Sequence, residues 1–237
     1  VYKRQIVLSK NESIELIEDS NQQSMLSIYG KDLTAEAQKG SFDPVIGRET
    51  EINNLMRVLS RRNKNNPIII GHAGVGKTAI TFLLAQLISQ KKVPDSLKNL
   101  KLISLDFGAL VSGTKYRGQL EERLRSVLNE LEESGQGVIL LIDEIHTILN
   151  ADRSTIDISS ILKPLLTAGY LRCIGTTTPE RFRESIEKDQ LLNNCFQKIF
   201  VNEPSLELSS KILNGIKRKY EVHHGIKITK EAVNCAA

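Results

Sequence analysis

The sequence predicts an α/β domain built on a central, parallel, five-stranded sheet flanked by helices, followed by the start of a helical lid. In the middle of the chain, short apolar runs alternate with segments whose apolar residues recur at helical spacing. The run Val138–Ile142 has no polar alternation, as expected at the centre of a parallel sheet. Beyond Pro204, helical spacing returns at Leu208, Ile212, Ile216 and Tyr220, which predicts the second, helical unit.

The composition is that of an ordinary globular domain and argues against several kinds of partner. Of the 237 residues, 40% are hydrophobic and 25% are charged. The net charge is +4 with both signs mixed along the chain, and aromatic residues make up 5%. These values do not suggest a nucleic-acid surface, which needs a concentrated basic patch or stacking aromatics. No apolar run approaches the roughly 20 residues of a membrane span. We therefore expect no nucleic-acid partner and no membrane partner.

Cysteine usage indicates a reducing compartment, either the cytoplasm or the matrix or stroma of an organelle. Cys173, Cys195 and Cys235 are odd in number and widely spaced. This pattern fits neither a disulfide framework nor the ligand spacing of a zinc site.

The N-terminal third is expected to contain an arm, two helices and the first strand. Residues 1–32 are largely polar, which predicts a linker or arm. A short helix is expected over 33–40, before a turn at 41–47. An amphipathic helix then ends near Arg61 and Arg62, and an apolar run at 68–70 predicts a buried strand.

A phosphate-binding loop follows this strand. Residues 71–78 read Gly-His-Ala-Gly-Val-Gly-Lys-Thr and fit the pattern G-x-x-x-x-G-K-[ST]. Glycines let successive backbone N–H groups point inward at phosphate oxygens, and the following helix N-terminus adds partial positive charge. We expect Lys77 to reach the β- and γ-phosphates and the Thr78 hydroxyl to bind Mg²⁺. The whole loop is assigned to ATP binding: Gly71, His72, Ala73, Gly74, Val75, Gly76, Lys77 and Thr78.

The later elements continue the alternation of strand and helix. Strands are expected at 102–106, 138–142, 171–174 and 199–201, and helices at 80–88, 120–131 and 156–167. The predicted boundaries are an arm at 1–32, the α/β nucleotide-binding domain at 33–204 and the start of the lid at 205–237.

Two acidic residues end the central strand and complete the expected site. Asp143 is placed to hold Mg²⁺, and Glu144 to polarise the attacking water as a general base. Both lie where strand C-termini converge in such sheets. Thr178, past the strand that ends at 174, is expected to sense the γ-phosphate. We expect His146 to serve helix packing rather than catalysis.

Several motifs resemble the first AAA+ module of the Clp unfoldases and heat-shock disaggregases. They cover nearly the whole chain from about Ser27. The motifs are Asp-Pro-Val-Ile-Gly-Arg at 43–48, Gly-Val-Gly-Lys-Thr-Ala-Ile at 74–80, Gly-Thr-Lys-Tyr-Arg-Gly at 113–118, Ile-Asp-Glu-Ile-His-Thr at 142–147, Phe-Gln-Lys at 196–198 and Tyr-Glu-Val-His-His at 220–224.

The resemblance implies a ring-forming, hexameric ATPase of the P-loop AAA+ fold that uses ATP and Mg²⁺. Val45 and Ile46, with Ile212 and Leu213 of the lid, would contact adenine. Tyr116, flanked by Lys115 and Arg117, would lie on a pore loop that grips unfolded or tagged polypeptide. An aromatic ring suits this task because it packs on any backbone or apolar side chain. A Clp-type peptidase would dock through regions outside this chain.

The sequence departs from the family at the arginine fingers. The family carries Arg-Arg before Phe-Gln, whereas this chain has Asn194 and Cys195. Neither supplies a permanent cation, and a finger is worth roughly 10³–10⁵ in rate. We therefore expect impaired hydrolysis across this module's interface. Residues 150–154 also lack the glycines usual in a second pore loop.

Three functions follow from these observations. The first is an ATP-driven protein unfoldase. The second is a nucleotide-binding structural subunit that turns over slowly, because the finger positions are degenerate. The third is a nucleic-acid remodelling ATPase such as a clamp loader or helicase, which the loop at 114–118 and the lack of a concentrated basic patch disfavour.

Overall fold

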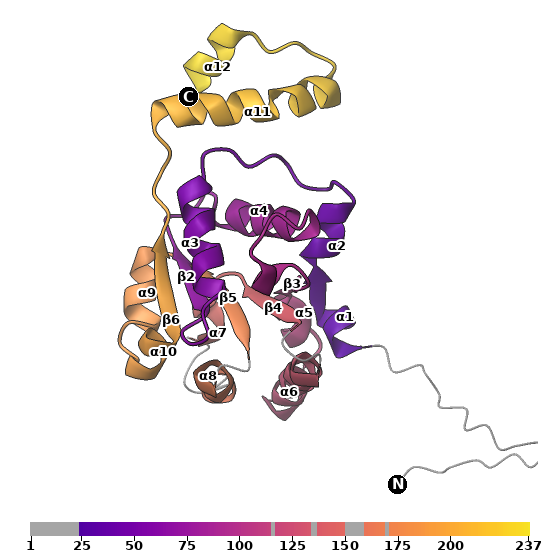
Figure 1. The fold of residues 1–237 in the computed structure, drawn as a ribbon, viewed down its shortest axis with the longest axis vertical. Helices are drawn as coiled ribbons and strands as arrows, with labels where there is room; N and C mark the ends of the chain where they lie inside the picture. The colour runs from indigo at the N-terminus through magenta and orange to yellow at the C-terminus, as the bar shows by residue number, and fades with distance from the viewer. Residues whose placement is uncertain (1–23, 115–116, 134–136, 150–158, 169–170) are drawn as a thin grey trace, which may run out of the picture.

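A computed structural model describes residues 24–114, 117–133, 137–149, 159–168 and 171–237 (Figure 1). Its sheet has six strands in the order β1-β3-β4-β5-β2-β6. The strands are β1 (Gly30–Asp32), β2 (Asn66–Ile70), β3 (Lys101–Leu105), β4 (Val138–Ile142), β5 (Arg172–Thr177) and β6 (Phe196–Phe200). The helices are α1 (Met25–Tyr29), α2 (Leu33–Gln38), α3 (Glu49–Leu59), α4 (Lys77–Ser89), the 3₁₀ turn η1 (Asp95–Leu97), α5 (Phe107–Val111), α6 (Arg117–Glu133), α7 (His146–Leu149), α8 (Ser159–Ala168), α9 (Pro179–Ser185), α10 (Gln190–Cys195), α11 (Leu206–His224) and α12 (Lys230–Ala236).

The five predicted strands are confirmed, and all of them run parallel. The sixth strand, β1, was not predicted and pairs antiparallel with β3 at the sheet edge. Residues 24–32, expected to belong to a polar arm, therefore form α1 and β1. The Glu130 carboxylate of α6 anchors this segment by accepting the backbone N–H groups of Met25 at 2.7 Å and Leu26 at 2.9 Å. The three-residue strand Gly-Lys-Asp has no apolar alternation, so periodicity gave no signal for it.

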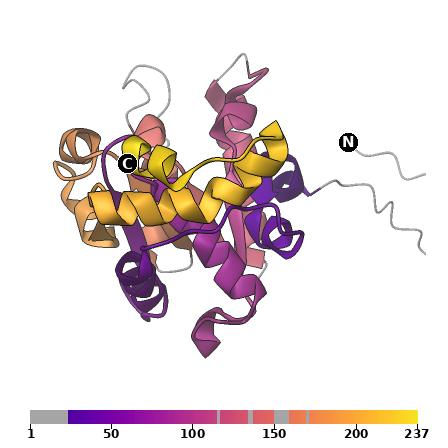
Figure 2. The same ribbon diagram turned by 90° about the horizontal axis from the view of Figure 1, so that it is seen from above.

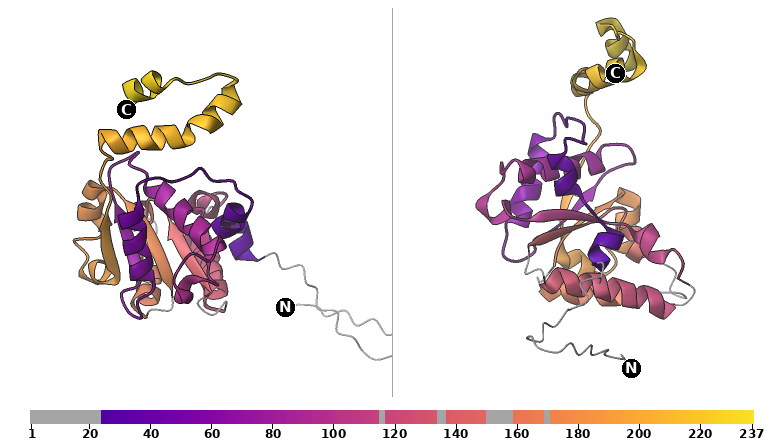
Figure 3. Two further views of the ribbon diagram at one scale, coloured as in Figure 1. Left: turned by 45° about the horizontal axis from the view of Figure 1, so that its top comes forward. Right: turned by 90° about the vertical axis from the view of Figure 1, so that its right-hand side faces the viewer.

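The five parallel strands contribute residues to two apolar layers, one on each face of the sheet. Ile69 and Ile139 face the layer formed with α2, α3 and α4. Ile68 and Leu140 face the layer formed with α6, α8, α9 and α10. Figure 3 shows these helices on the two sides of the sheet. The fully buried strands β2 and β4 are thus held on both faces, which fixes the position of the loops at their C-terminal ends.

The lid helices α11 and α12 lie above the α/β domain and cross it in Figure 2. The lid contacts the loop that precedes α3. Gly215 of α11 leaves room for Ile46, because a Cβ there would lie 2.1 Å from Ile46 Cδ1. Lys219 Nζ lies 2.6 Å from Asp43 Oδ1. The loop before α3 and the helix α11 both line the cavity described below.

The three cysteines carry free thiols. Cys173 lies in the core, and burial raises the pKa of its thiol to about 12, so it stays protonated at neutral pH. Among the described helices, none has the length and apolar character needed to cross a lipid bilayer.

Candidate functional site

The predicted phosphate loop joins β2 to α4, as the sequence indicated. Gly74 and Gly76 adopt positive φ angles of 83° and 95°, a conformation that costs other residues about 1–2 kcal/mol. Gly76 is the N-cap of α4, so the helix N-terminus opens directly onto the loop. Backbone N–H groups and the helix dipole therefore face the position expected for phosphate.

Lys77 closes the mouth of this loop. Its side chain is only 7% exposed, and Nζ donates to the carbonyl oxygens of Gly71 at 2.9 Å and His72 at 3.0 Å. The same nitrogen lies 4.0 Å from Glu144 Oε1. A buried ammonium held only by carbonyls and one carboxylate is a ready partner for phosphate oxygens.

The structure brings both predicted Mg²⁺ ligands together. Thr78 Oγ1 donates to Asp143 Oδ2 at 3.4 Å, although the two residues are 65 positions apart. Hydroxyl and carboxylate oxygens fit Mg²⁺, which takes one or two protein ligands and completes its shell with phosphate and water. Among the described residues, no cluster of three or more His, Cys, Asp or Glu side chains could hold a metal ion.

The acidic pair is held by β5, the strand that lies between β2 and β4. Thr176 Oγ1 donates to Asp143 Oδ1 and accepts the backbone N–H of Glu144 at 2.9 Å. Glu144 has a φ of +49°, in the left-handed region, and its side chain is 45% exposed toward the loop. A strained backbone at a functional carboxylate is typical of sites whose geometry is imposed by their surroundings.

Two threonines that the sequence did not single out therefore support the site. Thr176 and Thr177 are fully buried and contact the acidic pair and His146 respectively. Thr178, the expected sensor, caps α9 and accepts the backbone N–H of Arg181 at 3.4 Å. Its role toward the γ-phosphate stays a prediction. Three consecutive threonines look alike in sequence, and only the register of β5 tells them apart.

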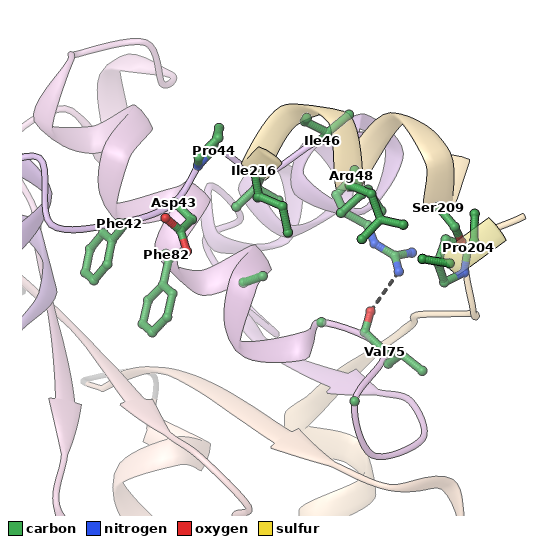
Figure 4. A pocket seen from close by; sticks show the side chains of 18 of the residues that line it. Phe42, Asp43, Pro44, Ile46, Arg48, Val75, Phe82, Pro204, Ser209 and Ile216 are labelled. Atoms are coloured by element: carbon green, nitrogen blue, oxygen red, sulfur yellow. Dashed lines mark hydrogen bonds between the residues drawn. The ribbon is translucent and has the colours of Figure 1, made fainter. Parts of the chain in front are cut away.

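A cavity of about 630 Å³ adjoins the phosphate loop, between the α/β domain and the lid (Figure 4). The four residues expected at the adenine, Val45, Ile46, Ile212 and Leu213, all line it, together with Gly74, Val75 and Gly76 of the loop. Sequence reasoning missed Phe42, Phe82 and Ile216 in its wall. The two phenylalanine rings stack with centroids 4.4 Å apart. A largely apolar cavity beside a phosphate loop is suited to a nucleotide base.

Arg48 is a further residue of this wall whose role was missed. Its guanidinium donates to the Val75 carbonyl of the loop at 2.7 Å, to the Asn202 carbonyl at 3.1 Å and to Glu51 Oε1 at 2.9 Å. Figure 4 shows the guanidinium directed at Val75. Because residue 202 leads from β6 to the lid, this one side chain ties the phosphate loop to the base of the lid.

Comparison with known proteins identifies the class of this site. Residues 67–203 match the "ATPase family associated with various cellular activities (AAA)", and residues 205–237 match the AAA lid domain. The first match alone spans more than half of the chain. The chain belongs to the AAA ATPase family.

Within this family, the relatives are Clp-type chaperones. The chain is 58% identical over 221 residues to "Chaperone protein ClpB 2" of Parasynechococcus marenigrum, covering 93% of this chain and 25% of the relative. It superposes on the S. cerevisiae Hsp104–ADP complex with a TM-score of 0.83 and 48% identity, covering 90% of this chain and 30% of that one. The S. cerevisiae Hsp104:casein complex gives a TM-score of 0.81 and 47% identity, covering 90% of this chain and 36% of that one. The chain thus spans about a quarter of the curated relative. These matches confirm the resemblance to Clp-type AAA proteins.

Two groups of predicted residues remain, those of the expected pore loops and those of the arginine-finger positions. Lys115 and Tyr116 of the expected pore loop lie outside the described residues, as do residues 150–154, and Arg117 is described only as the first residue of α6. At the end of α10, Asn194 is exposed, whereas Cys195 is buried with Sγ 3.5 Å from Thr167 Oγ1. The Cys195 side chain therefore packs inside its own subunit.

Proposed function

We propose that this AAA chain is the first nucleotide-binding module of a ring-forming, Clp-type chaperone, and that it binds and hydrolyses Mg-ATP to unfold polypeptides. The observation that carries this is the convergence of Lys77, Thr78, Asp143 and Glu144 beyond the C-terminal ends of β2 and β4, which flank β5 in the sheet. Similarity to ClpB and Hsp104 supports the same class.

Each residue of this cluster has a chemical task. Lys77 would bind phosphate oxygens, and Thr78 and Asp143 would hold Mg²⁺, which would neutralise charge on the phosphates. Glu144 orients a water molecule and accepts its proton as the water attacks the terminal phosphorus, while the bond from that phosphorus to the bridging oxygen breaks and ADP leaves. The base fills the cavity between the loop that precedes α3 and α11, so bound nucleotide touches both the α/β domain and the lid.

Coupling to polypeptide would run through Tyr116. The S. cerevisiae Hsp104:casein complex pairs that protein with casein. For this chain we propose unfolded or tagged polypeptide as substrate, within a homo- or hetero-hexamer. A Clp-type peptidase would dock through regions outside residues 1–237. Free thiols, two of them buried, suit the reducing interior of a cytoplasm or organelle.

A second candidate function is a structural ring subunit that binds ATP and hydrolyses it slowly. The observation that favours it is the environment of the finger positions. Asn194 is exposed but neutral, and Cys195 is buried within its own subunit. Neither can deliver a cation to the ATP of a neighbouring subunit.

The test is the steady-state ATPase rate of the full-length protein with unfolded casein, with double-stranded DNA and with neither. Stimulation by casein alone supports the unfoldase. Stimulation by DNA alone would replace it with a nucleic-acid remodelling ATPase. Tight ATP binding with negligible turnover under all three conditions would select the structural subunit.

A further inference from the structure

The carboxylate of Glu144 has a protein neighbour on the side away from Lys77. His146, the first residue of α7, places Nδ1 3.3 Å from Glu144 Oε2. The same nitrogen lies 3.1 Å from the hydroxyl of Thr177, at the end of β5. Thr177 is fully buried and the His146 side chain is only 13% exposed, so the imidazole is fixed by its surroundings whereas Glu144 is half exposed.

We propose that His146, seated on Thr177, is a positioning residue that holds the Glu144 carboxylate in place for the attacking water. This inference rests on the proposed ATPase function and assigns a task to a side chain that sequence reasoning gave to helix packing. His146 itself does not touch the reacting atoms.

Hydrogen-bond chemistry selects one form of the imidazole. An ionised carboxylate only accepts hydrogen bonds, so Nδ1 must carry a proton to hold Glu144. The Thr177 hydroxyl can accept a share of that same proton while it donates elsewhere. Burial is the largest effect on the pKa of His146 and lowers it. The charges of Arg181 and Lys77 also lower this pKa, whereas those of Glu144 and Glu184 raise it. A pKa below its ordinary value favours the neutral ring at pH 7, and the proposed contact with Glu144 requires the one proton of that ring to lie on Nδ1.

Glu144 needs such support because its backbone alone does not fix the carboxylate. The backbone is held by its N–H bond to Thr176 Oγ1 and by its φ of +49°, but the side chain extends into an open site. Two consecutive residues of β5 therefore have different roles. Thr176 holds the backbone of Glu144, and Thr177 holds the His146 imidazole, which in turn positions the Glu144 carboxylate. A general base must lie within hydrogen-bond reach of its water, and a displacement of about 1 Å can reduce rate roughly 10²-fold.

The experiment compares two substitutions of His146 in the full-length protein. His146→Asn keeps an N–H donor close to the position of Nδ1, whereas His146→Leu has similar bulk and no donor. The readouts are kcat and KM for ATP hydrolysis and the affinity for a fluorescent ADP analogue. We expect His146→Leu to lower kcat by about 10–100-fold, as loss of a supporting hydrogen bond does at other sites, with ADP affinity unchanged. His146→Asn should retain most of the wild-type kcat.

A matched pair at Thr177 keeps the test decisive if His146→Leu does not fold. Thr177→Ser retains the hydroxyl and Thr177→Val removes it at similar volume, so only the latter should lower kcat. Wild-type kcat in His146→Leu, or an equal loss in His146→Asn and His146→Leu, would overturn this inference and leave the proposed function standing. No turnover by the wild-type protein would overturn both.

Discussion

Replacing Arg48 with Met tests whether one buried cation holds the phosphate loop to the base of the lid. The Arg48 side chain is 8% exposed and that of Glu51 is 18% exposed. Met fills a similar volume but leaves the carbonyls of Val75 and Asn202 without their donor and the Glu51 carboxylate without its cation. Removing one partner of a buried ion pair costs about 3–5 kcal/mol. We expect a loss of that size in the free energy of unfolding, and weaker binding of ADP because the Val75 carbonyl belongs to the loop.

The control is Lys219→Met, which breaks the Lys219–Asp43 pair. That contact is shorter, at 2.6 Å against 2.9 Å for Arg48–Glu51, but its two side chains are 53% and 63% exposed. Exposed ion pairs contribute about 0–1 kcal/mol. Urea unfolding monitored by circular dichroism gives both values, and an unchanged m-value shows that the denatured state is the same. The reasoning is refuted if Arg48→Met costs no more than Lys219→Met.

Three further predictions concern the loop, the cavity and the subunit interface. Gly76→Ala and Gly40→Ala each place an alanine where the backbone has a positive φ (95° and 71°), and each should lower the free energy of unfolding in urea by about 1–2 kcal/mol. Only Gly76→Ala should abolish binding of fluorescent ADP. Loss of ADP binding in both variants would contradict the assignment of residues 71–78 as the phosphate loop. Ile216→Ala should weaken ADP binding about tenfold, while Val222→Ala, 77% exposed on the same helix, should leave it unchanged; equal effects would remove the base from this cavity. Asn194→Arg should raise the ATPase rate of the assembled ring by at least about tenfold, since a finger is worth roughly 10³–10⁵; an unchanged rate would show that the neutral residue does not limit hydrolysis.

The sequence predicted those parts of the fold and site that depend on local pattern. The strand Val138–Ile142 is apolar throughout, and its boundaries are confirmed by the structure. The phosphate loop has fixed spacing and a strand and helix on either side. Its convergence with Asp143 follows from parallel strands whose C-terminal ends share one edge. The four residues expected at the adenine were implied by the resemblance to the Clp family rather than by local pattern, and all four line one cavity.

Contacts set by the folded chain could not be predicted in this way. Arg48 bonds to a carbonyl 154 positions away, and nothing in the turn before α3 indicates that partner. The separate roles of Thr176 and Thr177 depend on the register of β5 against β4 and on the turn after Asp143. β1 is three residues long and polar, and it joins the sheet through backbone pairing with β3, which no side-chain pattern records.

The central claim is tested most directly by the pair Glu144→Gln and Lys77→Ala in the full-length protein, with ATP binding and ATP hydrolysis measured on the same samples. Gln keeps the shape of Glu144 but cannot accept a proton from water, so Glu144→Gln should bind ATP as tightly as the wild type and lose casein-stimulated turnover. Lys77→Ala should lose ATP binding. Wild-type turnover in Glu144→Gln, or undiminished ATP binding in Lys77→Ala, would contradict the account of this site.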